Sequence, residues 1–223
     1  MIPRELLATA TVPDGEELRL YRRGGDFMIV VQRNELMNSR MSGSEEALAT
    51  LAAARLAHAL AQRVLIGGYG MGFTLRAALG VLGAQARVTV AEIVPEIIEW
   101  ARGPMAALTA GALDDPRVAV RLADVGAVIG EAPRAFDAIL LDVDNGPDGL
   151  TRAGNGGLYA PAGLARAMAA LRPGGVLAIW SAYDDEAFTR RLGAAGFRVE
   201  AVPVRARANG KGARHVIWFA TRR

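Results

Sequence analysis

The chain has 223 residues, of which 52% are hydrophobic and 22% charged, so it can bury a sizeable core as an ordinary globular protein. It has no cysteine and two histidines, which excludes disulfides and thiolate metal sites and leaves us expecting no metal. The net charge of +3 is spread among acidic residues, so we expect neither a nucleic-acid nor a membrane partner and place the protein in the cytoplasm.

The first 43 residues differ from the rest of the chain. Two short runs, Leu18–Tyr21 and Phe27–Val31, flank a glycine-rich turn and predict a β-hairpin. We therefore expect residues 1–43 to form a β-hairpin extension and residues 44–223 to form the main domain. Exposed strands in such an extension could pair between subunits, so a homodimer is plausible.

The extension leads into a helix. Ser42 and Glu45 have the spacing of a capping box, and the apolar density from Ala47 to Leu60 is typical of a helix packed on a core.

From there on, strand and helix patterns alternate. Helices are expected at Phe73–Leu82, Pro95–Ala101, Pro161–Leu171 and Asp185–Ala195. Strands are expected at Val64–Ile66, Val88–Glu92, Val118–Val120, Ala138–Asp142, Val176–Trp180, Arg198–Val204 and His215–Ala220. This order predicts an α/β fold with a doubly wound, mostly parallel seven-stranded sheet whose ligands bind at the carboxyl ends of the strands. The Asn-Gly pair at 209–210 predicts that the last two strands form an antiparallel hairpin.

The most informative motif lies between the first strand of this sheet and the helix after it, where residues 63–76 read RVLIGGYGMGFTLR. Gly68, Gly70 and Gly72 let the backbone turn sharply and approach a ligand closely. The dinucleotide motif G-x-G-x-x-G is not met, because its third glycine would fall on Phe73. The remaining G-x-G-x-G pattern favours an adenosyl sulfonium ligand, and Glu92 at the end of the next strand is placed to accept its ribose hydroxyls.

Acidic residues also follow the next two strands. Asp124 could accept the adenine amino group, or it could cap a turn. Asp142 and Asp144 end an apolar strand, where two carboxylates could hold a cationic amine or accept a proton from a nucleophile. For Asp144 a simple turn is an equal alternative.

Two aromatic residues are candidates for the substrate pocket. Trp180 ends a strand and could form a wall of the acceptor site, although it could equally belong to the core. Tyr159 lies on a glycine-rich connection that could close over the site. The turn at 144–147, Asp-Asn-Gly-Pro, is unlike the Pro-Pro-aromatic turn that grips a flipped base, which again argues against a nucleic-acid substrate.

Taken with Glu92, Asp124 and the segment 136–142, the glycine loop resembles that of the spermidine synthase-like family, and the resemblance covers most of the chain. It implies the fold of class I S-adenosylmethionine-dependent methyltransferases and aminopropyl transfer from decarboxylated S-adenosylmethionine to a polyamine. It further implies that Glu92 binds ribose, Asp124 the adenine side, and that Asp142 deprotonates the attacking amine.

The chain departs from the family pattern where the amine groups of the ligands would bind. The loop aspartate that pairs with the ammonium of the decarboxylated cofactor is replaced by Met71, a Tyr-Gln pair by Ser44-Glu45, and an acid or amide after the fifth strand by Trp180. Because Met71 would not repel a carboxylate, we expect intact S-adenosylmethionine as cofactor and methylation of a small-molecule acceptor. Aminopropyl transfer is the alternative, and a catalytically silent nucleotide-binding scaffold is the third possibility.

Overall fold

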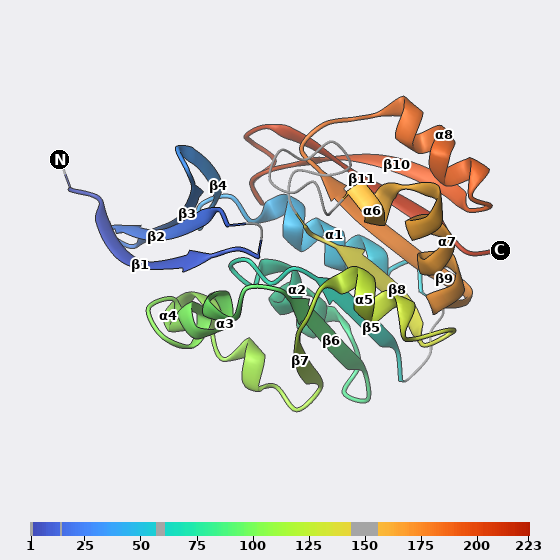
Figure 1. Ribbon diagram of the computed structural model, residues 1–223, viewed down its shortest axis with the longest axis horizontal. Coiled ribbons are helices and arrows are strands. Elements are labelled where there is room, and N and C mark those ends of the chain that lie inside the picture. The colour runs from blue at the N-terminus through green and yellow to red at the C-terminus, as the bar shows by residue number, and fades with distance from the viewer. Residues whose placement is uncertain (1, 14, 57–60, 144–155) are drawn as a thin grey trace.

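The computed structural model describes residues 2–13, 15–56, 61–143 and 156–223 (Figure 1). The chain forms two sheets, a small antiparallel one at the N-terminus and a seven-stranded one that carries the rest of the fold. In the described part of the chain, no helix is both long enough and apolar enough to cross a membrane.

The large sheet has the strand order β10-β11-β9-β8-β5-β6-β7. Its strands are β5 (Arg63–Gly67), β6 (Arg87–Glu92), β7 (Val118–Leu122), β8 (Phe136–Leu141), β9 (Leu171–Ser181), β10 (Arg198–Arg205) and β11 (Arg214–Thr221). The pairings among β5 to β9 are parallel, whereas β11 runs antiparallel to both β9 and β10. The predicted fold class, the seven strands and the terminal hairpin are therefore confirmed.

Strand order reverses between β5 and β8, because the chain goes from β5 outward through β6 and β7 and then returns to the other side of β5. In sheets of this kind the carboxyl ends of the strands at such a reversal leave a crevice for a ligand. The glycine loop follows β5 and Asp142 follows β8, so both lie at this crevice.

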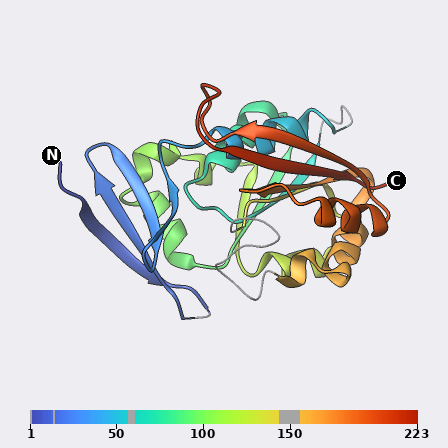
Figure 2. The ribbon, with the colours of Figure 1, turned by 90° about the horizontal axis from the view of Figure 1, so that it is seen from above.

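Helices cover both faces of the large sheet (Figure 2). On one face pack α1 (Gly43–Ala53), α2 (Phe73–Val81) and α3 (Pro95–Arg102); on the other pack α5 (Val125–Gly130), α7 (Pro161–Ala170) and α8 (Glu186–Ala194). Alternate strand residues point to opposite faces, so Val64 and Ile66 join the first hydrophobic cluster while Leu65 joins the second. Short helices α4 (Ala106–Thr109) and α6 (Gly156–Tyr159) and a 3-10 turn at Ala112–Asp114 complete the described elements.

The N-terminal extension is larger than the predicted hairpin. The hairpin is present as β2 (Glu17–Arg23) and β3 (Asp26–Val31), and β1 (Glu5–Thr11) and β4 (Asn34–Asn38) extend it to a four-stranded antiparallel sheet. Figure 1 shows this sheet at one end of the molecule, beside α3 and α4. Several of its buried side chains belong to the same hydrophobic cluster as α3, so it packs on the large domain; they are Ala10, Leu18, Leu20, Ile29 and Val31. The boundary at residue 43 stays a prediction.

The predicted capping box is wrong. Helix α1 begins after Ser42 as expected, but the Ser42 side chain makes no capping hydrogen bond. Glu45 instead accepts a hydrogen bond from the Ser44 hydroxyl and is buried, with 9% of its surface exposed. The spacing of Ser42 and Glu45 predicts a helix cap, whereas in the folded chain the Glu45 carboxylate lines the pocket. Of the helix predicted as far as Leu60, residues 57–60 lie outside the described part.

Candidate active site

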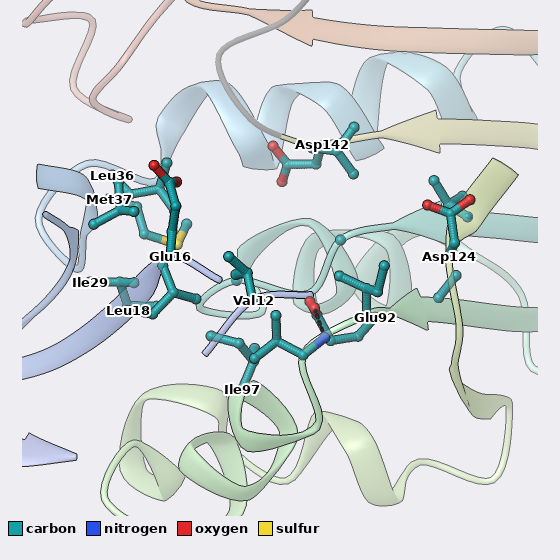
Figure 3. Close-up of a pocket in the computed structure, with 18 of the residues that line it drawn as sticks. Val12, Glu16, Leu18, Ile29, Leu36, Met37, Glu92, Ile97, Asp124 and Asp142 are labelled. Carbon is teal, nitrogen blue, oxygen red and sulfur yellow. Dashed lines mark hydrogen bonds between the residues drawn. The ribbon is translucent and has the colours of Figure 1, made fainter. Parts of the chain in front are cut away.

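A pocket lies between the N-terminal sheet and the carboxyl ends of β5 to β9 (Figure 3). Its volume is about 170 Å³, which exceeds by roughly tenfold the space that one water molecule requires. The small sheet contributes an apolar wall, and Figure 3 shows that wall opposite Asp142, Asp124 and Glu92. That wall consists of Val12, Leu18, Ile29, Val31, Leu36 and Met37.

Two loop glycines line the pocket in a conformation that other residues rarely adopt. Gly68 has φ +83°, and a Cβ there would lie 2.5 Å from the carbonyl oxygen of Asp142. Gly70 has φ +54°, and a Cβ there would lie 2.8 Å from the Met37 sulfur of the small sheet. The bare backbone thus keeps the mouth of the pocket open between two sheets, as the sequence predicts for a loop that approaches a ligand.

Glu92 holds the glycine loop in place. Its carboxylate accepts hydrogen bonds from the backbone nitrogens of Tyr69, at 2.9 Å, and Val94, at 2.8 Å. The side chain is 7% exposed, and burial raises its pKa while the backbone donors oppose that shift. The backbone groups of Ile93 and Gly70 also act on this carboxylate, and Glu92 lines the pocket. A contact between Glu92 and the hydroxyl groups of a ligand stays a prediction.

Met71 and Gly72 do not line this pocket. Met71 is fully buried in the hydrophobic cluster, and Gly72, with φ +77°, caps α2 beneath the ring of Tyr69. The cofactor contacts predicted for both residues therefore have no support in this geometry. The physical reason is that the loop turns its backbone to the pocket at 68 and 70, which points the Met71 side chain into the core.

Asp124 caps a helix, and its predicted contact with the adenine amino group stays a prediction. It caps α5 by accepting a hydrogen bond from the backbone nitrogen of Ala127, at 3.1 Å, and it also lines the pocket. Capping engages Oδ1, so a ligand donor would have to share that oxygen or use Oδ2.

Asp142 faces a second acid that the sequence analysis did not include in the site. The Thr74 hydroxyl donates a hydrogen bond of 2.6 Å to Asp142 Oδ2, and Glu45 lines the pocket beside it. Burial raises the pKa of Asp142 to about 6; burial and then the charge of Asp142 raise the pKa of Glu45 to about 7. Two neighbouring carboxylates with pKa values near neutrality can hold a cation and can exchange a proton with it.

A hydrogen-bonded chain leads away from Glu45. Ser44 Oγ lies 2.6 Å from Glu45 Oε2 and 2.9 Å from the Nδ1 atom of His215 at the start of β11. The His215 ring in turn contacts Trp180 edge to face, with 4.8 Å between ring centroids. Trp180 lines the pocket, and its contact with an acceptor stays a prediction. Sequence patterns gave no sign that Ser44 and His215 meet, because 171 residues separate them.

The remaining predicted site residues lie elsewhere. Tyr159 is 1% exposed, packs edge to face on Phe188 and belongs to the hydrophobic cluster on the other side of the large sheet. Its predicted contact with an acceptor therefore has no support, because it does not line the pocket. Asp144 lies outside the described residues.

The charged side chains that line the pocket are all acidic. Within the described ranges of the chain, the lining contains no lysine, arginine or histidine. The acids are Glu16, Glu45, Glu92, Asp124 and Asp142. Among the same described residues, no group of three or more His, Cys, Asp or Glu side chains is arranged to hold a metal ion. The pocket therefore suits an organic ligand that carries positive charge.

Curated proteins similar to this chain are named as aminopropyltransferases. A polyamine aminopropyltransferase of Mycobacterium tuberculosis is 36% identical over 122 residues, which are 53% of this chain and 22% of the relative. Polyamine aminopropyltransferase 2 of Pseudomonas aeruginosa is 34% identical over 130 residues, which are 56% of this chain and 35% of the relative. The matched region thus spans between about a fifth and a third of these relatives.

Among solved structures, spermidine synthase of Thermotoga maritima has the same fold, with a TM-score of 0.77 at 18% identity over 98% of this chain and 73% of that one. A probable spermidine synthase of Corynebacterium glutamicum gives a TM-score of 0.67 at 17% identity over 96% of this chain and 79% of that one. The family model described as "spermine/spermidine synthase domain" matches residues 42–185, which include the glycine loop, Glu92, Asp124 and Asp142. The chain belongs to the spermine/spermidine synthase domain family.

Proposed function

We propose that this protein transfers an aminopropyl group from decarboxylated S-adenosylmethionine to an amine acceptor. The observation that carries the proposal concerns the charged side chains that line the pocket in the described part of the chain, all of which are acidic. Decarboxylated S-adenosylmethionine bears a sulfonium and an ammonium, and a polyamine acceptor bears further ammonium groups. Both substrates are purely cationic, as the lining requires.

The same lining disfavours the first expectation from the sequence, methyl transfer from intact S-adenosylmethionine. Intact cofactor adds a carboxylate, and the described lining offers that carboxylate no cationic side chain. A like charge at about 4 Å costs about 4 kcal/mol at an effective dielectric constant near 20. Met71 would not repel this carboxylate, but its side chain lies in the core and gives the carboxylate no favourable contact in the pocket. Family membership and the names of the relatives point the same way.

At the nucleoside end of the pocket, the residues of the chain position the donor substrate and do not react with it. Gly68 and Gly70 provide bare backbone, and Glu92 fixes the loop while it accepts the ribose hydroxyls. Asp124 is placed to accept a donor from the base. These contacts hold the donor substrate so that its reacting carbon faces the acceptor side. When bound, the sulfonium supplies a leaving group that departs as a neutral thioether.

At the acceptor end, the chain must bind an ammonium and then remove a proton from it. Asp142 and Glu45 together attract the cation, and their raised pKa values make each a competent proton acceptor near pH 7. Trp180 forms part of the wall there and limits the space open to water. Asp142 is the principal base in this proposal, and Thr74 fixes its orientation.

The test is product identification with purified protein. Incubated with decarboxylated S-adenosylmethionine and putrescine, the chain should release methylthioadenosine, and calorimetry should show tighter binding of the decarboxylated cofactor than of the intact one. S-Adenosylhomocysteine formed from intact cofactor would instead establish methylation. Binding without turnover across a panel of amines would contradict both and favour the scaffold.

A further inference from the structure

In the proposed reaction Asp142 and Glu45 both face the acceptor amine, and Glu45 can take the proton from that amine directly or through Asp142. Aminopropyl transfer forms one C–N bond and breaks one C–S bond, whose electron pair goes to sulfur. An acceptor that enters as an ammonium and leaves as a substituted ammonium releases one proton per turnover. The acceptor end lies in a partly buried pocket between two sheets, so this proton needs a route to solvent.

We propose that Glu45, Ser44 and His215 form a relay that carries this proton from the acceptor site to the start of β11. Glu45 lines the pocket, Ser44 Oγ joins it at 2.6 Å, and His215 Nδ1 lies 2.9 Å beyond. The relay rests on the proposed function, since it presupposes an amine that loses a proton in this pocket.

The three groups can pass one proton from Glu45 to His215, after which the ring must exchange its Nδ1 proton before the next turnover. Ser44 is fully buried and has a single hydroxyl proton for two neighbours. When Glu45 is protonated, it donates to Ser44 Oγ while the serine proton points to His215 Nδ1. When the proton moves on, Nδ1 receives the serine proton, the serine receives the glutamic acid proton, and Glu45 is again a carboxylate. His215, which is half-buried, then releases a proton from Nε2.

The surroundings of the three groups favour this use over a purely structural contact. Asp142 at the end of β8 and Glu46 on α1 are the charged groups that act on Glu45, and both disfavour its ionised form. Burial lowers the pKa of His215, which prevents the ring from retaining the proton that it receives. The contact between the His215 ring and Trp180 holds the imidazole at the edge of the acceptor wall.

The first test compares three variants by the kcat and the acceptor KM of methylthioadenosine formation. Ser44→Ala interrupts the chain and should lower kcat at least tenfold, with acceptor KM changed less than twofold. His215→Asn keeps a polar atom near the Nδ1 position but cannot take up a proton, so it should lower kcat similarly. Ser42→Ala is the matched control, because Ser42 lies two residues away on the same helix start and makes no capping bond; it should keep the wild-type kcat.

The pH profile separates the relay from a fold defect. Ser44 donates a hydrogen bond that lowers the pKa of Glu45, so Ser44→Ala should move the acid limb of kcat to higher pH. His215→Asn retains that donor and should leave the acid limb in place. Imidazoles of similar shape, added to His215→Ala, should restore kcat, and the restored kcat should increase with the pKa of the added imidazole. If the imidazoles only filled the cavity, the restored kcat would not depend on their pKa.

A second readout does not require turnover. In the wild type, NMR titration of the His215 ring should respond to the charge of Glu45, so Glu45→Gln should lower the pKa of His215. An unchanged His215 titration would overturn the relay, as would wild-type kcat and pH profile in both Ser44→Ala and His215→Asn. A wild-type chain that releases no methylthioadenosine would instead contradict the proposed function itself, which keeps the two failures distinct.

Discussion

The two ends of the pocket are built differently. At the nucleoside end, the ligand-facing groups come from consecutive elements, the loop after β5 and the end of β6, and backbone atoms dominate. At the acceptor end, side chains from α1, β8 and β9 meet around a pair of acids, and β11 supplies the histidine behind them. The first end is a local motif, and the second exists only in the folded chain. Substitutions at the nucleoside end should therefore weaken cofactor binding, and substitutions at the acceptor end should lower kcat.

The largest effect should come from Asp142→Asn, which removes the principal base and keeps the shape of the side chain. We expect turnover to fall about 10²- to 10⁴-fold, as is typical for loss of a general base. Binding of decarboxylated S-adenosylmethionine, measured by calorimetry, should be unchanged. Asp184→Asn, an exposed acid outside the pocket, is the control. Equal loss of binding and turnover would mean that Asp142 has a structural role and would remove the distinction between the two ends.

Gly70→Val should act at the opposite end. The positive φ strains any L-residue, and the added carbons would fill the space between the loop and Met37. We expect cofactor binding to weaken about 10- to 100-fold, because the contact with Met37 forces the loop or the wall to shift and such overpacking costs about 1–3 kcal/mol. Gly80→Val provides the matched control, because a Cβ there meets open space. A folded Gly70→Val protein that binds cofactor normally would contradict the loop assignment.

Glu92→Gln tests whether the carboxylate organises the loop. An amide has one acceptor oxygen for the two backbone donors of Tyr69 and Val94, so one of them must face an NH2 group. An unsatisfied buried donor costs about 1–3 kcal/mol, and we expect cofactor affinity to drop about 10- to 100-fold while kcat at saturation changes less. Glu99→Gln, an exposed acid on α3, should have no effect. A large fall in kcat at saturating cofactor would argue against a positioning role.

The smallest effect concerns stability at the acceptor end. Because burial raises the pKa of Glu45 to about 7 and that of Asp142 to about 6, the folded chain binds more protons than the unfolded chain between about pH 4 and 7. The contribution of these groups to stability is therefore present at low pH and is lost as pH rises through this window. Glu45→Gln should raise the free energy of unfolding at pH 8 by on the order of 1–2 kcal/mol and leave it nearly unchanged at pH 5.

Urea denaturation at pH 5 and pH 8 measures this effect, with Glu99→Gln, which changes an exposed acid on α3, as control. If Glu45→Gln destabilised the protein at pH 8, the carboxylate would be stabilised in the folded state. Glu45 and Asp142 would then not be a pair of buried carboxylates whose pKa values are raised.

Much of the fold followed from local patterns in the sequence. Alternating apolar runs and helix signals predicted all seven strands of the large sheet, because the apolar runs of its central strands are buried on both faces. The small sheet was predicted only as its central hairpin. Its outer strands β1 and β4 carry mixed, partly exposed residues, whose pattern is weak without knowledge of the helix that they pack near. Helix α5 was missed for a related reason, since six residues give little periodicity.

The sequence by itself determined the glycine loop and the acid beside it, because a turn of bare backbone and the acid at the next strand end are set by neighbours along the chain. Only the tertiary structure decided the acceptor end. It turned Met71 into the core, moved Glu45 from a helix cap to the pocket, and brought His215 to Ser44. Contacts between segments this far apart depend on how strands order in the sheet and on which face a helix buries, and no local pattern encodes either.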